Sequence, residues 1–188
     1  MPKKVSTVDY YVDIRILADP EFEPTLLLNA LFAKLHRALV QTGTQSIGIS
    51  FPCLPSDQKN LGDCLRLHGM NADLEQFMAS GWLIGMRDHI LVQGPLSIPR
   101  TVVYRVVRRV QVKSNPARLQ RRWMRRHGST CLLRHRKIET DLPFLQILSQ
   151  STGEHFRLFI KHCPVSASPV VGKFSYYGLS ATATVPWF

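Results

Sequence analysis

The sequence predicts an α+β fold, in which a ferredoxin-like domain is followed by a C-terminal α/β part. Three observations support this prediction. The 188 residues are 45% hydrophobic, which is enough apolar surface for a packed core. Strand-like and helix-like segments follow one another over the first half in the order β-α-β-β-α-β. The second half contains a β-branched run, a basic helix and a hairpin pattern. We therefore expect two parts, residues 1–98 and 99–188.

In the first half, alternating apolar and polar side chains predict a strand over residues 9–17, ended by Asp19-Pro20. Pro24 then begins a helix rich in Leu and Ala that extends to about Gln41, with Gly43 just beyond its end. The other expected elements are two short strands, a helix capped by Asn71 and ending near Ser80-Gly81, and a fourth strand, at residues 46–51, 64–68, 71–80 and 90–93.

The second half is predicted to begin with a long strand over residues 101–113. Its last odd positions are Arg109, Gln111 and Lys113, so we expect a polar, basic face opposite a buried one. Ser114-Asn115-Pro116 places a capping residue before a proline, which predicts a helix that ends at Gly128. The remaining elements are a hairpin joined by Thr152-Gly153-Glu154 and a further strand, at residues 144–151, 155–162 and 174–177.

Positive charge is concentrated in one stretch of the chain. The formal net charge is +11, and no Asp or Glu occurs between His89 and Ile138. Within the expected helix the arginines recur at spacings of three and four, so they share one side: Arg118, Arg121, Arg122, Arg125 and Arg126. Like charges four residues apart each cost the helix about 0.2–0.5 kcal/mol. A phosphate backbone would relieve this repulsion, so the helix predicts nucleic-acid binding; a solvated face or an acidic protein partner is the alternative.

Composition also bears on compartment and cofactors. The sequence has no apolar run long enough to span a membrane, and its start lacks the apolar core of a signal peptide, so we expect a cytoplasmic protein. Four scattered cysteines without a Cys-x-x-Cys pair are expected to be free thiols. No metal-binding motif is present, and we expect no cofactor.

Several strings in the chain carry a family resemblance. They include Leu31-Phe32-Ala33-Lys34-Leu35-His36, Arg109-Val110-Gln111-Val112-Lys113-Ser114-Asn115-Pro116, Ser149-Gln150-Ser151-Thr152-Gly153 and Tyr177-Gly178-Leu179-Ser180. With these strings the sequence resembles the type I-F (Ypest subtype) CRISPR-associated endoribonucleases, which process precursor crRNA. The match extends from about Asp9 to Phe188.

The resemblance implies a specific activity. The enzyme would bind the CRISPR repeat stem-loop with the arginine helix in its major groove, and would cut at the 3′ base of the stem. It would remain on the mature crRNA and join the other subunits of the type I-F crRNA-guided surveillance complex. We expect a monomer when the protein is free. RNA supplies its own nucleophile, the 2′-hydroxyl, so the expected cleavage is metal-independent and leaves a 2′,3′-cyclic phosphate and a 5′-hydroxyl.

The site residues follow from the same resemblance. His36 is the candidate general base, Ser149 would anchor the attacking 2′-hydroxyl, and Tyr177 would orient the histidine. Spacing alone favours a structural role for His36, at the edge of an apolar helix face. Phe156 would stack on the terminal base pair of the stem, and Ser151 would hold a neighbouring phosphate or sugar.

The basic strand and helix supply the expected RNA contacts. Arg109 and Gln111 would read bases, because Arg pairs bidentately with guanine and Gln with adenine. The helix arginines and His127 would contact the backbone. Two alternatives stay open at this stage: a non-catalytic RNA-hairpin-binding protein and a basic DNA-binding protein.

Overall fold

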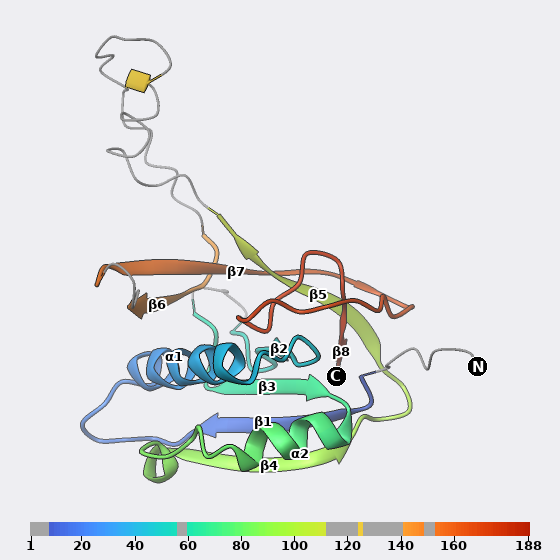
Figure 1. Ribbon diagram of the computed structural model, residues 1–188, viewed down its shortest axis with the longest axis horizontal. Coiled ribbons are helices and arrows are strands. Elements are labelled where there is room, and N and C mark those ends of the chain that lie inside the picture. The colour runs from blue at the N-terminus through green and yellow to red at the C-terminus, as the bar shows by residue number, and fades with distance from the viewer. Residues whose placement is uncertain (1–7, 56–59, 112–123, 126–140, 149–152) are drawn as a thin grey trace.

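The computed structural model describes residues 8–55, 60–111, 124–125, 141–148 and 153–188. In this part of the chain the strands form two four-stranded sheets, one from each half of the sequence, and every neighbouring pair of strands is antiparallel. Figure 1 shows the two sheets as stacked layers, with α1 between the first sheet and the hairpin of the second. The chain is therefore an α+β protein.

The first sheet has the strand order β2-β3-β1-β4. Its central strand β1 has the burial alternation that the sequence predicts, with Val12, Ile14 and Ile16 buried on one face. The four strands are β1 (Tyr10–Ile16), β2 (Gly48–Ser50), β3 (Cys64–Gly69) and β4 (Ile90–Ser97).

Two α-helices belong to the described residues of this half, α1 (Pro24–Thr42) and α2 (Asn71–Ala79). α1 begins at a proline, whose missing N–H is not needed in the first turn, and ends at Gly43 in the left-handed conformation. Its leucines at positions 27, 28, 31, 35 and 39 are buried and form one side of the core. A short 3-10 helix, η1 (Arg87–His89), leads into β4.

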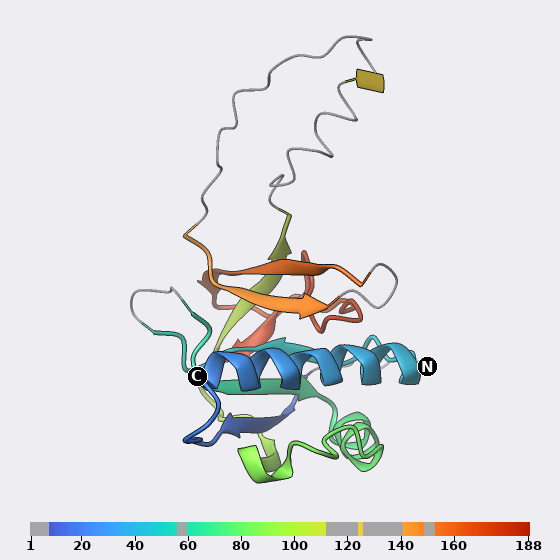
Figure 2. The ribbon, with the colours of Figure 1, turned by 90° about the vertical axis from the view of Figure 1, so that its left-hand side faces the viewer.

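The second sheet has the strand order β6-β7-β5-β8. Its strands are β5 (Val103–Val110), β6 (Phe144–Leu148), β7 (His155–Ser166) and β8 (Val185–Trp187). β6 and β7 form the predicted hairpin, in register from the Phe144–Phe159 pair to the Leu148–His155 pair. Figure 2 shows α1 directly beneath this hairpin. One face of the hairpin therefore packs on the body, and the other face points away from it.

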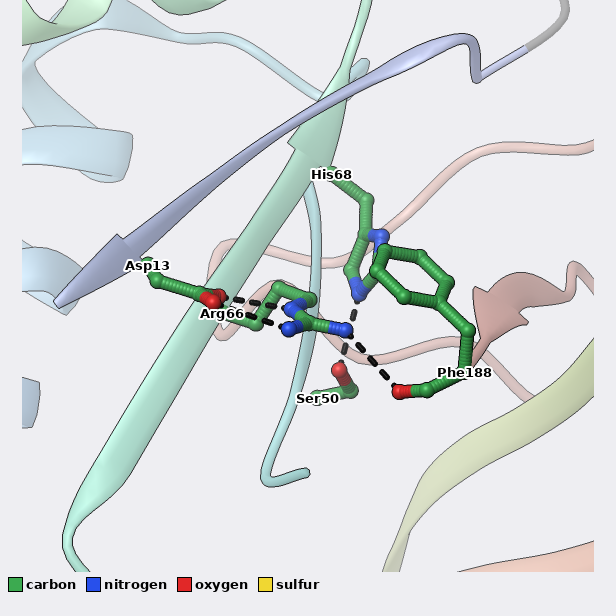
Figure 3. A network of polar contacts seen from close by, with 5 residues as sticks. All are labelled: Asp13, Ser50, Arg66, His68 and Phe188. Atoms are coloured by element: carbon green, nitrogen blue, oxygen red, sulfur yellow. Dashed lines mark hydrogen bonds and ion pairs between the residues drawn. The ribbon is translucent and has the colours of Figure 1, made fainter. Parts of the chain in front are cut away.

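A buried arginine joins the last residue of the chain to the first sheet (Figure 3). Arg66 on β3 donates two hydrogen bonds to the Asp13 carboxylate, at 2.6 and 2.8 Å, and one to the Phe188 carbonyl oxygen at 3.2 Å. Its guanidinium also lies over the rings of Tyr11 and Phe188, at 4.6 and 4.1 Å. We call these four residues the Arg66 clamp. Because Phe188 follows β8, the clamp connects the two sheets.

Some predicted boundaries were wrong. β4 was expected to stop before Gly94-Pro95 but continues to Ser97, which is possible because an edge strand tolerates proline. Asn71 is the first helical residue and not the cap; its side chain donates to Glu75, while the Met70 carbonyl accepts the first helical bond. The expected strand at residues 174–177 is a turn, because Gly178 adopts a φ of +70° and donates back to Ser175.

The faces of β5 also differ from the expectation. Arg109 pairs with Ile160 on the inner face, the same side as buried Val107, whereas Arg108 pairs with Lys161 on the outer face. Both faces are therefore basic near the end of this strand, beyond the edge of the core. The expected helix at residues 116–127 lies outside the described residues, apart from exposed Met124 and Arg125.

Candidate active site

His36 lies on α1 where the helix faces the turn that precedes Gly178. Its Nδ1 is 2.8 Å from the Tyr176 carbonyl oxygen. A carbonyl oxygen only accepts hydrogen bonds, so the proton of the neutral imidazole is on Nδ1. The lone pair of Nε2 is then free to accept a proton. The half-buried ring is thus held in the tautomer that a general base requires.

Tyr177 fixes the plane of this imidazole. The Tyr177 and His36 rings stack with centroids 4.1 Å apart and planes 9° apart. On the same helix, one turn earlier, Phe32 lies parallel to Tyr177 at 6.3 Å. The predicted contact between Tyr177 and His36 is present, but the hydrogen bond comes from the neighbouring backbone and the Tyr177 ring contributes through stacking.

The turn that carries Tyr176 and Tyr177 is attached to both sheets. Ile49 on β2 donates to the Gly178 carbonyl oxygen at 2.9 Å, and Ser180 donates to the Val107 carbonyl oxygen on β5 at 3.1 Å. Gly178 is needed here for two reasons: its φ is +70°, and an added Cβ would lie 2.5 Å from a methyl group of Ile49. The position of the His36 partner is therefore set by the packing of both halves.

Arg109 and Phe156 complete the cluster from the second sheet. The Arg109 guanidinium carbon is 5.7 Å from the Tyr177 ring centroid and 5.8 Å from the Phe156 centroid, so the cation lies between two rings. The Arg109 side chain is exposed and Phe156 is half-buried. The structure thus brings four predicted residues together in the order His36, Tyr177, Arg109 and Phe156.

This arrangement combines three functions at one place. Nε2 of His36 is available for proton transfer, the Arg109 guanidinium can pair with a phosphate or a guanine, and the Phe156 ring offers a stacking surface. A phosphodiester with a neighbouring base and ribose hydroxyl would use all three.

A hydrogen bond between α1 and β6 holds the hairpin against the histidine helix. The Asn29 side-chain oxygen accepts from the Gln146 N–H at 3.0 Å. β6 is an edge strand, so this donor has no strand partner on that side. Sequence reasoning missed Asn29, because a single polar residue on a helix gives no periodic signal. It equally missed the Tyr176 carbonyl, since a backbone group cannot be recognised from residue type.

Comparison with known proteins identifies the family. The family model described as CRISPR-associated protein (Cas_Csy4) matches residues 11–188, which is nearly the whole chain. The chain belongs to the Cas_Csy4 family. A protein of Pseudomonas aeruginosa (strain UCBPP-PA14) named CRISPR-associated endonuclease Cas6/Csy4 is 49% identical over 187 residues, covering 96% of this chain and all of the relative. A protein of the same name from Escherichia coli (strain UTI89 / UPEC) is 45% identical over 190 residues, with the same coverage.

The remaining predicted site residues of this Cas_Csy4 member are either exposed or outside the described residues. Gln111 directly follows β5 and is exposed, as is Arg125. Outside the described residues lie Ser149, Ser151, Arg118, Arg121, Arg122, Arg126 and His127. Ser149 directly follows Leu148, the last residue of β6, and Leu148 pairs with His155 next to Phe156.

Two other histidines, one buried and one half-buried, pack within the Cas_Csy4 fold. His68 is fully buried, and its Nε2 is 2.8 Å from the Ser50 hydroxyl; burial lowers its pKa to about 3. His162 packs edge-on against Phe51 and Trp187, and burial together with the Arg105 charge lowers its pKa to about 4. With these lowered pKa values both imidazoles are neutral at physiological pH, and His68 is fully enclosed by the protein.

A fourth histidine, His89, is the last residue of η1. His89 Nδ1 is 2.7 Å from the Asp19 carboxylate, which also accepts from the backbone N–H groups of Glu21 and Phe22. These N–H groups, with His89, lower the pKa of Asp19. Of the histidines that the structure describes, His36 is the one that stacks on Tyr177, the ring over which Arg109 also lies.

The described residues contain neither a metal-ligand cluster nor a helix that could span a membrane. There, no three His, Cys, Asp or Glu side chains gather as a metal ion would require. Neither described α-helix combines the length and hydropathy needed to cross a bilayer. The cysteines at positions 53, 64 and 163 are free thiols, and burial raises the pKa of Cys64 to about 12.

Proposed function

We propose that this protein is an endoribonuclease that binds the stem-loop of CRISPR repeat RNA in precursor crRNA and cuts at the 3′ foot of the stem. The observation that carries the proposal is the His36 imidazole, whose Nδ1 is held by the Tyr176 carbonyl and whose ring stacks on Tyr177, next to which Arg109 and Phe156 lie. Membership of the Cas_Csy4 family, and the endonuclease name of two relatives that span nearly the whole chain, support the same reaction class.

The proposed reaction uses a nucleophile that the RNA provides. His36 Nε2 removes the proton from the 2′-hydroxyl, the 2′-oxygen forms a bond to the adjacent phosphorus, and the bond from phosphorus to the 5′-oxygen breaks. The departing 5′-oxygen takes up a proton. The products are a 2′,3′-cyclic phosphate and a 5′-hydroxyl, and no step requires a metal ion.

Each predicted residue has a proposed part in this reaction. Ser149 anchors the 2′-hydroxyl, Tyr177 holds the imidazole plane, and Phe156 stacks on the last base pair so that the scissile bond meets His36. Arg109 and Gln111 read bases at the foot of the stem. The backbone contacts come from Ser151, Arg118, Arg121, Arg122, Arg125, Arg126 and His127.

The architecture supports a division of labour. We propose that residues 1–98 are a ferredoxin-like domain that supplies His36, and that residues 99–188 recognise the RNA. The strand order β2-β3-β1-β4 and the element order β-α-β-β-α-β support the first part, and the basic strand β5 supports the second. We further propose that the protein is a cytoplasmic monomer when free, and that it stays on the crRNA within the type I-F surveillance complex.

The decisive experiment is cleavage of a repeat hairpin in EDTA. Wild-type protein should cut it, and His36→Ala should lower the single-turnover rate by about 100-fold to 10,000-fold, the usual contribution of general acid–base catalysis, with hairpin affinity unchanged. A 2′-deoxy substitution at the scissile nucleotide should abolish cutting by the wild type.

Three results would contradict the proposal. Cutting that stops in EDTA would contradict the metal-independent reaction. Tight hairpin binding without any cutting would identify a non-catalytic RNA-binding protein. Equal affinity for duplex DNA would indicate a DNA-binding protein.

A further inference from the structure

The outer face of the second sheet is open, aromatic and basic. Partners across antiparallel strands share a face, and Leu158 and Ile160 of β7 are buried, so the odd positions of β7 point outward. The residues on this outer face are Arg108, Val110, Phe144, Gln146, Leu148, His155, Arg157, Phe159 and Lys161. We call this set the outer platform. It lies on the side of the β6–β7 hairpin that is turned away from α1 (Figure 2).

An aromatic pair forms the centre of the outer platform. The Phe144 and Phe159 rings are cross-strand partners with centroids 5.5 Å apart and planes 58° apart. The Arg157 guanidinium lies over the Phe144 ring at 4.6 Å. Phe144 is nevertheless 37% exposed, and Leu148 beside it is 53% exposed. A pair whose role was only to stabilise the hairpin would not require such exposure or the surrounding cations.

The charge on the outer platform has one sign. Arg108 and Lys161 lie opposite each other on β5 and β7, Arg157 is four residues before Lys161 on the same face of β7, and none of the platform residues is acidic. The nearest acids in the sequence, Asp141 and Glu154, lie outside the strands. Like charges facing each other across a pair of strands destabilise the sheet, so a polyanion is the partner that this face fits.

Exposed rings among cations suit unpaired bases better than a duplex. The bases of a duplex already stack on one another, whereas a single strand offers free base faces to aromatic and guanidinium groups. A four-stranded sheet that presents aromatic side chains is a frequent surface for single-stranded RNA.

The position of the outer platform relates it to the cut. Phe156 points to the active site from the inner face of β7, and its neighbour Arg157 points outward. Because Phe156 and Arg157 are adjacent in β7, the active-site cluster and the outer platform lie back to back on the same strand.

We infer that the outer platform binds the unpaired RNA that adjoins the foot of the stem. The inference rests on the proposed function, because it assumes that the stem is held at His36 and Phe156. It adds a second binding surface to the enzyme, one that holds flanking nucleotides by stacking and charge without reading their sequence.

Binding of a cleavage-blocked hairpin, with a 2′-deoxy at the scissile nucleotide, tests this inference. The hairpin is compared bare, with a 5′ oligouridine tail and with a 3′ oligouridine tail. Wild-type protein should bind at least one tailed form about five-fold or more tightly than the bare hairpin, since one stacked base alone accounts for that factor. The double variant Phe144→Ala/Arg157→Gln should lose this gain and keep its affinity for the bare hairpin.

Matched variants separate the effect from loss of structure. Phe22→Ala/Arg87→Gln removes the same side-chain types from exposed positions in the first half of the chain and should keep the full gain. Arg157→Gln/Lys161→Gln leaves the aromatic pair intact and should reduce both the gain and its salt dependence. The melting temperature of each variant shows whether the hairpin is still folded.

The outcomes are distinct. A tail that adds nothing to wild-type binding, or a gain that survives in the Phe144→Ala/Arg157→Gln variant, overturns the inference; a protein partner would then be the alternative occupant. Failure of the wild type to cut the unmodified hairpin would contradict the proposed function instead, and it is measured separately from the effect of the tail.

Discussion

Two arginines that lie against aromatic rings show how this molecule separates structure from function. Arg66 is 8% exposed, lies over Tyr11 and Phe188, and donates two hydrogen bonds to a carboxylate. Arg109 lies between Phe156 and Tyr177 with similar surroundings, but it is exposed, and the described residues pair no carboxylate with it. The first cation is neutralised within the protein. The second has its charge free for a phosphate or a base.

The same contrast extends to the two halves. In the first sheet, Arg66 is paired with the Asp13 carboxylate and His68 Nε2 with the Ser50 hydroxyl, although His68 Nδ1 has no partner among the described residues. In the second sheet, Arg108 and Lys161 face each other without a carboxylate between them. Paired charges stabilise a fold, and unpaired charges of one sign point to a ligand.

The largest expected effect is on stability, from Arg66→Ala. The change leaves the Asp13 carboxylate buried without its partner and removes the link to Phe188, so the free energy of unfolding should fall by about 3–5 kcal/mol. Urea denaturation measures this. Replacing both partners, with Arg66→Met and Asp13→Leu, should recover part of the loss; a double variant as unstable as Arg66→Ala would show that the charge pairing is not the cause.

A second expected effect is acid destabilisation through His68, which is fully buried, and His162, which is half-buried. The pKa values of His68 and His162 are lowered to about 3 and about 4, from 6.5. Below pH 6.5 the unfolded chain therefore binds protons that the folded chain does not, and stability falls as the pH is lowered. Each histidine should cost up to about 2 kcal/mol at pH 5. Urea denaturation at several pH values between 7 and 5 measures how the free energy of unfolding depends on pH, and His162→Leu should weaken this dependence. Equal stability at pH 7 and pH 5 would contradict the lowered pKa values of the two histidines.

Arg109→Ala should weaken RNA binding and leave stability unchanged, whereas Arg66→Ala lowers stability. An exposed side chain contributes little to folding, so the melting temperature should stay close to that of the wild type. Hairpin binding should weaken by about 1–3 kcal/mol, with relaxed preference for the base it contacts. Arg109→Lys keeps the charge but not the planar fork and should restore only part of the affinity. Arg100→Ala, at another exposed arginine of the same half, should bind normally.

The smallest expected effect is that of Asn29→Ala. Loss of the hydrogen bond to the Gln146 N–H should cost about 1 kcal/mol and loosen β6 against α1. Because Ser149 follows β6, the cleavage rate of bound RNA should fall more than hairpin affinity. Asn29→Asp keeps an acceptor at this position and should cut faster than Asn29→Ala. Equal rates for the two variants would show that the hydrogen bond to the Gln146 N–H does not position β6 for cleavage.

Much of the fold follows from local patterns in the sequence, and the exceptions have physical causes. The strand at Tyr10–Ile16 and the helix from Pro24 are predictable because alternation and end signals are local. The turn at Tyr176 resembles a strand in composition and forms because Gly178 and its bonds to Ile49 and Ser175 decide the backbone path. Those partners are distant in sequence, or are backbone groups.

The candidate site was partly predictable for the same reason. Residue spacing alone favours a structural role for His36, and only the family resemblance proposes it as a base. The structure stacks His36 on Tyr177 and places Arg109 against Tyr177 and Phe156, while the catalytic roles of these residues stay predictions. Asn29 and Arg66 had no sequence signal, because their importance depends on which strand or carboxylate the fold brings next to them.

The turn that holds Tyr176 and Tyr177 is hydrogen-bonded to both halves of the chain. Gly178 accepts a bond from Ile49 on β2, and Ser180 donates one to Val107 on β5. His36 comes from one half, while Arg109 and Phe156 come from the other. Neither half alone, as a fragment released by a protease or as a nascent chain still being synthesised, would contain a working nuclease. With the proposed site, RNA cutting would therefore begin only once both halves have folded together.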